Sequence, residues 1–175
     1  IINSPGNPTG SVYTKEELRA ISEVAAEEEI FILSDEIYER LTYEGAEHVS
    51  IASLTPEAHD LTITVNGFSK AYAMTGWRLG YLGAPEAIAK AIDSMQSHST
   101  SNPCSFAQKG GLAALKGDQQ CVTDMLVEYQ QRRPILAGDA GPPGHIGEGD
   151  VGEPEAFGDR RSREGGISHS SQRNE

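Results

Sequence analysis

The chain has 175 residues and a formal net charge of −12, so phosphate backbones and anionic membranes would repel it. We therefore expect no nucleic-acid or membrane partner. None of its apolar runs reaches the roughly 18 residues of a membrane-spanning helix. The two cysteines, Cys104 and Cys121, are too few for a disulfide framework, which favours a reducing, cytoplasmic location.

The first residues, Ile1 to Ser4, contain neither the basic nor the apolar segment of a secretory signal peptide. They also lack an initiating methionine, and we expect the chain to begin inside a longer protein.

The first predicted elements are a short opening strand at Ile1-Ile2 and a helix. The loop after the strand, SPGNPTG, consists of turn-forming residues. Thr14, followed three residues later by Glu17, has the pattern of a capping box, which starts a helix. Apolar residues then recur at helical spacing and form a stripe: Leu18, Ile21, Val24 and Ala25.

Three further strands are predicted from short apolar or β-branched runs. They are 30–34 (IFILS), 61–65 (LTITV) and 78–84 (RLGYLGA). Helices are predicted at 85–97, with Pro85 in the first turn, and at 105–116 and 118–132. Because strands alternate with helices, we predict an α/β fold with a three-layer, mostly parallel sheet flanked by helices.

The sequence changes character at Pro134. From there to Glu175 it is rich in glycine and has no helical or strand period. Such a segment buries too little apolar surface to offset the entropy of ordering, which predicts disorder. A second interpretation is that the reading frame changes near codon 134, because the change in composition is abrupt.

Side chains that could carry chemistry follow three of the predicted strands: Asn7, then Asp35 and Tyr38, then Ser69 and Lys70. In open α/β sheets, ligands bind beyond the carboxyl ends of the strands. We therefore expect these five residues to share one rim of the sheet.

Each candidate also has a purely structural explanation. Asp35 suits the N-cap of a following helix, and Asn7 lies in a natural turn between glycine and proline. Tyr38 could be a core residue with an exposed hydroxyl. Lys70 could be solvated surface, and Arg78 could stack on the neighbouring indole. The arrangement on successive strand ends is what favours function.

These groups together suit one cofactor. A partly desolvated lysine near another cation gives up its proton and forms Schiff bases with carbonyl groups. Arg78 could be that cation and could also bind a phosphate through two N–H groups. A carboxylate such as Asp35 can hold a pyridinium nitrogen, and a phenol and an amide can bond a ring oxygen. The set describes a cradle for pyridoxal phosphate, whose ring acts as an electron sink.

Three motifs, SPGNPTG, SDEIYE and NGFSKAYAMTGWRLGY, resemble those of the class I/II aminotransferases, which are fold-type I pyridoxal-phosphate enzymes. The resemblance covers about 1–133 and implies that this region is part of the large cofactor-binding domain, with 134–175 as a tail. It implies a homodimeric enzyme of the aspartate or aromatic type. Such an enzyme transfers an amino group between an amino acid and a 2-oxo acid.

The resemblance also implies roles for the rim residues. Lys70 would be the catalytic residue, at first bound covalently to pyridoxal 5'-phosphate and later moving a proton between the substrate α-carbon and the cofactor. Asp35 would pair with the pyridine nitrogen. Tyr38 and Asn7 would bond the ring hydroxyl of the cofactor.

Arg78 and Ser69 would bind the cofactor phosphate. Gly67 stands where many family members have serine, so one phosphate contact would be lost or made by a backbone N–H. The sequence SNP at 101–103 matches a family loop that reaches the active site of the neighbouring subunit. Asn102 is therefore a candidate cross-subunit residue.

Three alternatives stay open. The same fold hosts β-lyases and carbon–sulfur lyases. The chain could be a catalytically inactive fragment, because the family's cradle also uses segments outside it. It could also be a regulatory α/β domain. The histidines and cysteines lack metal-ligand spacing, and the GGLAALKG sequence at 110–117 has the wrong order for a phosphate-binding P-loop.

Overall fold

The computed structural model describes residues 1–43 and 45–136. In these residues there are four strands, five α-helices and two short 3-10 helices. Pro134 to Leu136 continue the last helix, and the rest of the predicted tail lies outside the described residues.

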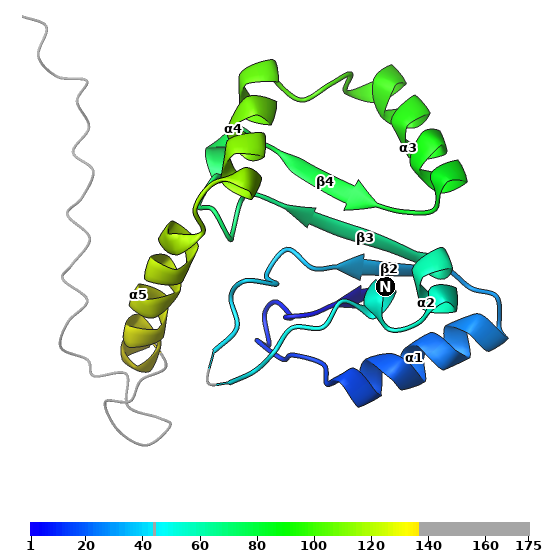
Figure 1. The fold of residues 1–175 in the computed structure, drawn as a ribbon, viewed down its shortest axis with the longest axis horizontal. Helices are drawn as coiled ribbons and strands as arrows, with labels where there is room; N and C mark the ends of the chain where they lie inside the picture. Colours follow the sequence, from blue (N-terminus) through cyan, green and yellow to red (C-terminus); the bar gives the residue numbers. More distant parts are fainter. Residues whose placement is uncertain (44, 137–175) are drawn as a thin grey trace, which may run out of the picture. The chain divides into compact units, whose positions relative to one another are not determined.

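The strands form one sheet in the order β1-β2-β3-β4 (Figure 1). They are β1 (Ile2–Asn3), β2 (Ile32–Asp35), β3 (Thr62–Gly67) and β4 (Gly80–Gly83). The first three are parallel, and β4 is antiparallel to β3. The predicted α/β class with a mostly parallel sheet is confirmed.

The strand boundaries differ from the predicted ones. β2 begins at Ile32 because Ile30 and Phe31, both more than half exposed, precede the paired segment. β4 begins only at Gly80, because Arg78 has a left-handed backbone with φ 49°, which a strand cannot continue. β4 runs back along β3 because residues 68–79 connect the two strands without a crossover α-helix.

The α-helices are α1 (Lys15–Glu27), α2 (Pro56–Leu61), α3 (Glu86–Ser99), α4 (Ser105–Lys116) and α5 (Gln120–Leu136). The predicted capping box is present, with Thr14 and Glu17 bonded reciprocally at the start of α1. Pro85 is the N-cap of α3 rather than its first helical residue. α2 was not predicted, although Thr55 before proline is a typical helix start.

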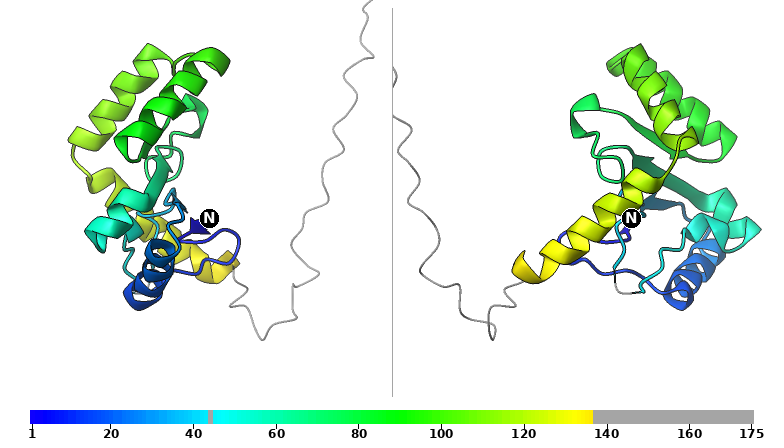
Figure 2. Two further views of the ribbon diagram at one scale, coloured as in Figure 1. Left: turned by 90° about the vertical axis from the view of Figure 1, so that its right-hand side faces the viewer. Right: turned by 60° about the vertical axis from the view of Figure 1, so that its left-hand side comes forward.

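One side of the sheet is covered by α1 and the 3-10 helix η1 (Ile51–Ser53). Leu18 and Ala25 of α1 pack with Ile32 of β2 and with Ile51, and all four are buried. Val24 lies at the edge of the apolar stripe and is 56% exposed. Its side chain is rotated by about 100° about the helix axis from that of the buried Ala25. α1 also packs against α2, and the two helices lie together in Figures 1 and 2.

Cys104 and Cys121 are free thiols and both are exposed. Among the described helices, none combines the length and the apolar character that a membrane crossing requires.

Candidate functional site

Asn3 of β1 pairs with Asp35 of β2, and Asp35 pairs with Val65 of β3, so β1 and β2 end side by side while β3 continues two residues further, to Gly67. Asn3 was not a sequence candidate, yet it joins two of the strand ends. Its amide nitrogen donates to the Asp35 carbonyl at 3.1 Å, and its side-chain oxygen accepts from the Asn7 N–H at 2.8 Å. Asn3 could have been predicted as a site residue, because it ends a strand and precedes a loop of turn-forming residues.

Asn7, Tyr38 and Lys70 come from three different strand-end loops, and the structure brings them together. Asn7 Nδ2 donates a 3.3 Å hydrogen bond to the Tyr38 hydroxyl. Lys70 Nζ lies 5.5 Å from the centroid of the Tyr38 ring, within the range of a cation–π attraction. These three residues share one rim, as expected from the parallel strands.

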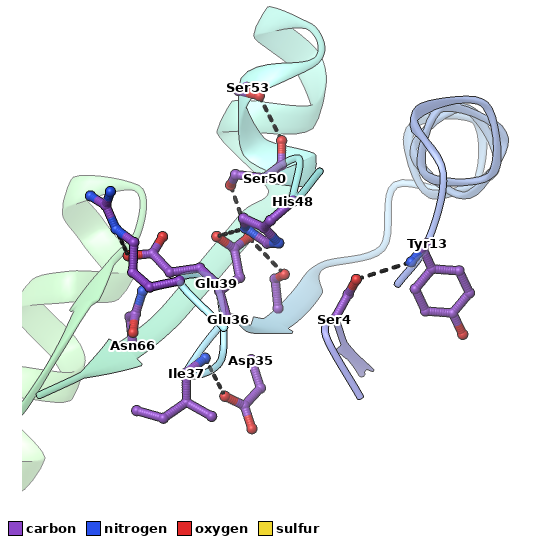
Figure 3. A network of polar contacts seen from close by, with 12 residues as sticks. Ser4, Tyr13, Asp35, Glu36, Ile37, Glu39, His48, Ser50, Ser53 and Asn66 are labelled. Carbon is purple, nitrogen blue, oxygen red and sulfur yellow. Dashed lines mark hydrogen bonds and ion pairs between the residues drawn. The ribbon is translucent and has the colours of Figure 1, made fainter. Parts of the chain in front are cut away.

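Asp35 is the last residue of β2 and is partly buried. Its Oδ1 accepts a 3.2 Å hydrogen bond from the Ile37 N–H (Figure 3). That bond caps a turn, since residues 37–40 form turns instead of the helix that an N-cap would begin. Within the described part of the chain, the second carboxylate oxygen accepts no hydrogen bond. One oxygen of Asp35 is therefore available to a ligand.

Lys70 lies in a compact turn after β3. The carbonyl of Phe68 accepts from the N–H groups of Tyr72 and Met74, both at 3.3 Å, and Ala73 N donates to the Lys70 carbonyl. Ser69 and Lys70 are half-buried and line a cavity of about 380 Å³. Lys70 makes no ion pair within residues 1–43 and 45–136.

Helix α4 packs closely behind this turn. A Cβ atom added to Gly111 would lie 2.5 Å from Leu79 Cδ2 and 2.9 Å from Phe68 Cζ. Phe68 and Leu79 are only 4% and 9% exposed, so an added methyl group would have to displace buried side chains. The glycine pair in GGLAALKG thus serves helix packing, because Gly110 faces Trp77 just as closely.

Arg78 is exposed, and its guanidinium Nη1 donates to the Thr75 carbonyl at 2.9 Å. Its backbone is left-handed, which for a residue with a side chain costs about 1 kcal/mol or more. No hydrogen bond or ion pair between described residues links Arg78 to Asp35 or Lys70. Its expected contact with a phosphate stays a prediction.

Asn102 is exposed in the loop between α3 and α4, next to Ser101, whose φ is 62°. Its expected role in a neighbouring subunit likewise stays a prediction.

A second cavity, of about 570 Å³, lies beside the rim. Its walls include Asn7 and Tyr38 together with Tyr43 and Ala46. Arg133 is 4.8 Å from the Tyr43 ring centroid. Burial raises the pKa of the Tyr43 hydroxyl above its usual value, and the nearby Arg133 charge opposes that effect only partly. Tyr43 therefore presents a neutral phenol to this cavity near pH 7.

Glu36 is a buried residue that the sequence analysis missed, with 3% of its surface exposed. Its carboxylate accepts from Ser34 Oγ at 3.0 Å and from Ser50 Oγ at 2.8 Å, and it contacts His48 Nε2 at 3.2 Å (Figure 3). Its position directly after a buried strand could have predicted this role, because a carboxylate buried there needs hydrogen-bond partners.

Comparisons with known proteins agree with the motifs. The family model described as "Aminotransferase class I and II" matches residues 1–139. The chain is 53% identical over 136 residues to an aspartate aminotransferase of Geobacillus stearothermophilus, covering 78% of this chain and 35% of that protein. It is 51% identical over 132 residues to an aspartate aminotransferase of Bacillus subtilis (strain 168), covering 75% of this chain and 34% of that protein.

Solved structures give a similar result. An aromatic aminotransferase from Pyrococcus horikoshii OT3 has a TM-score of 0.73 at 43% identity, covering 77% of this chain and 36% of that one. An aspartate aminotransferase from Rhizobium meliloti has a TM-score of 0.74 at 40% identity, covering 77% and 34%. The chain thus spans about a third of the length of the proteins it matches.

Proposed function

Because the chain belongs to the class I and II aminotransferases, we propose that its rim holds pyridoxal 5'-phosphate and serves amino-group transfer. The whole protein would move an amino group between aspartate and a 2-oxo acid, as the names of its relatives suggest. It would act as a homodimer, with the exposed Asn102 reaching the neighbouring active site. Its free, exposed cysteines suit a reducing, cytoplasmic location.

The rim residues fit this cofactor by charge and by hydrogen-bonding type. Asp35 has a carboxylate oxygen without a hydrogen bond from the described residues, and a pyridinium N–H is a strong donor to such an oxygen. Asn7 and Tyr38 already contact each other and can bond one ring oxygen together. The amine of Lys70 stands over the Tyr38 ring, beside these groups.

When bound, pyridoxal phosphate supplies an electron sink for the negative charge that develops at the substrate α-carbon. The chain's own residues orient the reacting groups and move the proton. Asp35, held at the end of β2, would keep the ring nitrogen protonated through its negative charge. Lys70 Nζ, which forms no ion pair with the described residues, would carry the proton between the substrate α-carbon and the cofactor.

The phosphate group would lie at the turn that carries Ser69. Its hydroxyl is on the same cavity wall as Lys70, so it can donate to a phosphate oxygen close to the amine. Arg78 uses Nη1 for the Thr75 carbonyl, so its remaining N–H groups would donate to a phosphate oxygen.

One observation carries the proposal: Lys70 Nζ lies 5.5 Å from the Tyr38 ring centroid, and the Tyr38 hydroxyl accepts from Asn7. To test it, the chain is incubated with pyridoxal phosphate, reduced with borohydride, digested and analysed by mass spectrometry. The label is expected on Lys70 and not on Lys90, whose exposed amine is paired with Glu86. A label mainly on another lysine, or no label, would contradict the proposal.

The reaction type needs the whole protein. With aspartate and a 2-oxo acid, a new amino acid is expected to form without net release of ammonia. Release of ammonia and pyruvate from a β-substituted amino acid, without amino transfer, would instead identify a β-lyase.

A further inference from the structure

The buried Glu36 side chain joins the end of β2 to the segment 45–50. Ser34 belongs to β2, while His48 and Ser50 belong to the segment 45–50, and all three contact the Glu36 carboxylate. The backbone N–H of Glu36 also donates to the Val65 carbonyl at 2.9 Å, which extends the pairing with β3 past the end of β2. A buried carboxylate with these partners fixes its own backbone in place.

Asp35 lies between two residues of this cluster. Along extended chain, side chains alternate between faces, so Ser34 and Glu36 point to one face of the sheet and Asp35 to the other. The 3.0 Å bond between Ser34 and Glu36 agrees with this alternation. In Figure 3, the Asp35 carboxylate points away from the Glu36–His48 contact. Fixing Glu36 on one face therefore aims Asp35 at the opposite face.

The same cluster holds a wall of the 570 Å³ cavity that Asn7 and Tyr38 line. Ala46 belongs to the segment 45–50, lines that cavity, and donates from its N–H to the Tyr43 carbonyl at 3.0 Å. His48 and Ser50 hold this segment in place through their contacts with the Glu36 carboxylate. One carboxylate thus links the direction of Asp35 to the position of the cavity wall.

The His48 ring depends on this contact. Its Nε2 faces a carboxylate, so that nitrogen carries a hydrogen and donates it. Its Nδ1 is buried and makes no hydrogen bond within the described part of the chain. Without Glu36, the ring would have no polar contact at either nitrogen, and the segment 45–50 would lose an anchor.

We propose that Glu36 is a positioning residue for the cofactor site. It holds Asp35 toward the pyridine nitrogen and holds the segment 45–50 as a cavity wall, through Ser34, His48 and Ser50. The inference concerning Asp35 rests on the proposed function, whereas the inference concerning the segment 45–50 does not.

The test compares Glu36→Gln with Glu47→Gln in the full chain. Both remove one negative charge, but Glu47 is exposed on the same segment, so its replacement is a matched control. Glutamine keeps the shape of the side chain but is neutral, so the contacts with Ser34, His48 and Ser50 lose their charge assistance. Hydrogen exchange of the amides in 45–50, without cofactor, should become about tenfold faster in Glu36→Gln only.

The second readout is the dissociation constant of pyridoxal phosphate, measured by absorbance. It should rise about tenfold in Glu36→Gln and stay unchanged in Glu47→Gln. His48→Gln, which keeps a side-chain N–H donor, should retain more affinity than His48→Leu. If Glu36→Gln does not fold, Ser50→Ala replaces it, with an expected effect of about threefold in both measurements.

The outcomes separate the two proposals. If the wild-type chain binds no pyridoxal phosphate, the proposed function fails. Hydrogen exchange of the amides in 45–50 then shows by itself whether Glu36 anchors that segment. If the wild type binds but Glu36→Gln matches Glu47→Gln in both measurements, the positioning role is overturned. Faster exchange with unchanged cofactor affinity would also overturn it, because Glu36 would then be only structural.

Discussion

Asn7 and Tyr38 lie 31 residues apart in the sequence, and Asn7 Nδ2 donates a 3.3 Å hydrogen bond to the Tyr38 hydroxyl. The bond spans the loops that follow β1 and β2. Asn3 stabilises the position of Asn7, because its side chain accepts from the Asn7 N–H and donates to the Asp35 carbonyl. The amide and the phenol are thus oriented before any ligand is present, which lowers the entropy cost of binding one.

Replacing Tyr38 with phenylalanine should weaken binding of pyridoxal phosphate about fivefold, equivalent to about 1 kcal/mol for one hydrogen bond. The aromatic ring beneath Lys70 is kept, so borohydride should still label Lys70. The affinity is measured by absorbance titration. Tyr13→Phe, at a partly exposed tyrosine of the segment before α1, is the control and should bind like wild type. Equal affinity of both variants would exclude a ligand contact for the Tyr38 hydroxyl.

Lys70→Ala should abolish covalent labelling and, in the whole protein, amino transfer. Its stability should change by no more than about 1 kcal/mol, because the side chain is half-buried and its described polar contact is a cation–π attraction. Urea unfolding measures the stability, and mass spectrometry after borohydride measures the label. Lys90→Ala should retain the full label. Turnover in a pure Lys70→Ala protein would rule out the catalytic role.

Gly111→Ala should destabilise the chain by about 1–2 kcal/mol. The new methyl group would meet Leu79 and Phe68 at 2.5 and 2.9 Å, and overpacking of buried side chains typically costs about 1–3 kcal/mol. The better helix propensity of alanine offsets at most about 1 kcal/mol. Gly83→Ala is the control, because a Cβ there meets nothing within 4 Å. Urea unfolding of the two variants should therefore differ in midpoint.

The capping box of α1 should make stability depend on pH in acid. Hydrogen bonds from the Thr14 backbone and side chain lower the pKa of Glu17 below that of an ordinary glutamate. A lowered folded-state pKa gives stability that is present above the unfolded pKa and is lost as pH falls through the folded pKa.

The measurement compares wild type with Glu17→Gln by urea unfolding at several pH values. The stability difference should be present at pH 6 and should shrink as the pH falls below about 4. Glu23→Gln, a change in the middle of the same helix, should show no comparable dependence. A difference that stayed constant down to pH 2 would show that the charge of Glu17 contributes nothing.

The rim could be predicted from the sequence because each strand end is marked by residues that are neighbours in the chain. A short apolar run followed by a polar residue marks a strand end, and parallel strands bring their carboxyl ends to one edge. That reasoning located Asn7, Tyr38 and Lys70, which the structure brings into contact. The capping box of Thr14 was equally local, since both of its partners lie within one helical turn.

The parts that were missed depend on contacts distant in sequence. Glu36 meets His48 and Ser50 only because the chain returns to β2, and no periodic pattern encodes that return. The role of Asn3 depends on the register between β1 and β2. The left-handed backbone of Arg78 could not be predicted, because arginine has no preference for that conformation.

The turn that carries Lys70 begins and ends at one point of the sheet. Gly67 pairs with Gly80, and Phe68 N donates to the Leu79 carbonyl at 3.3 Å. The segment from Phe68 to Leu79 is therefore a loop whose two ends are held together by the pairing of β3 with β4. Its two ends are therefore about 5 Å apart whatever its internal sequence. The corresponding loop of another aminotransferase could therefore be grafted between Phe68 and Leu79, with these two residues kept for their packing against α4, without changing the register of β3 and β4.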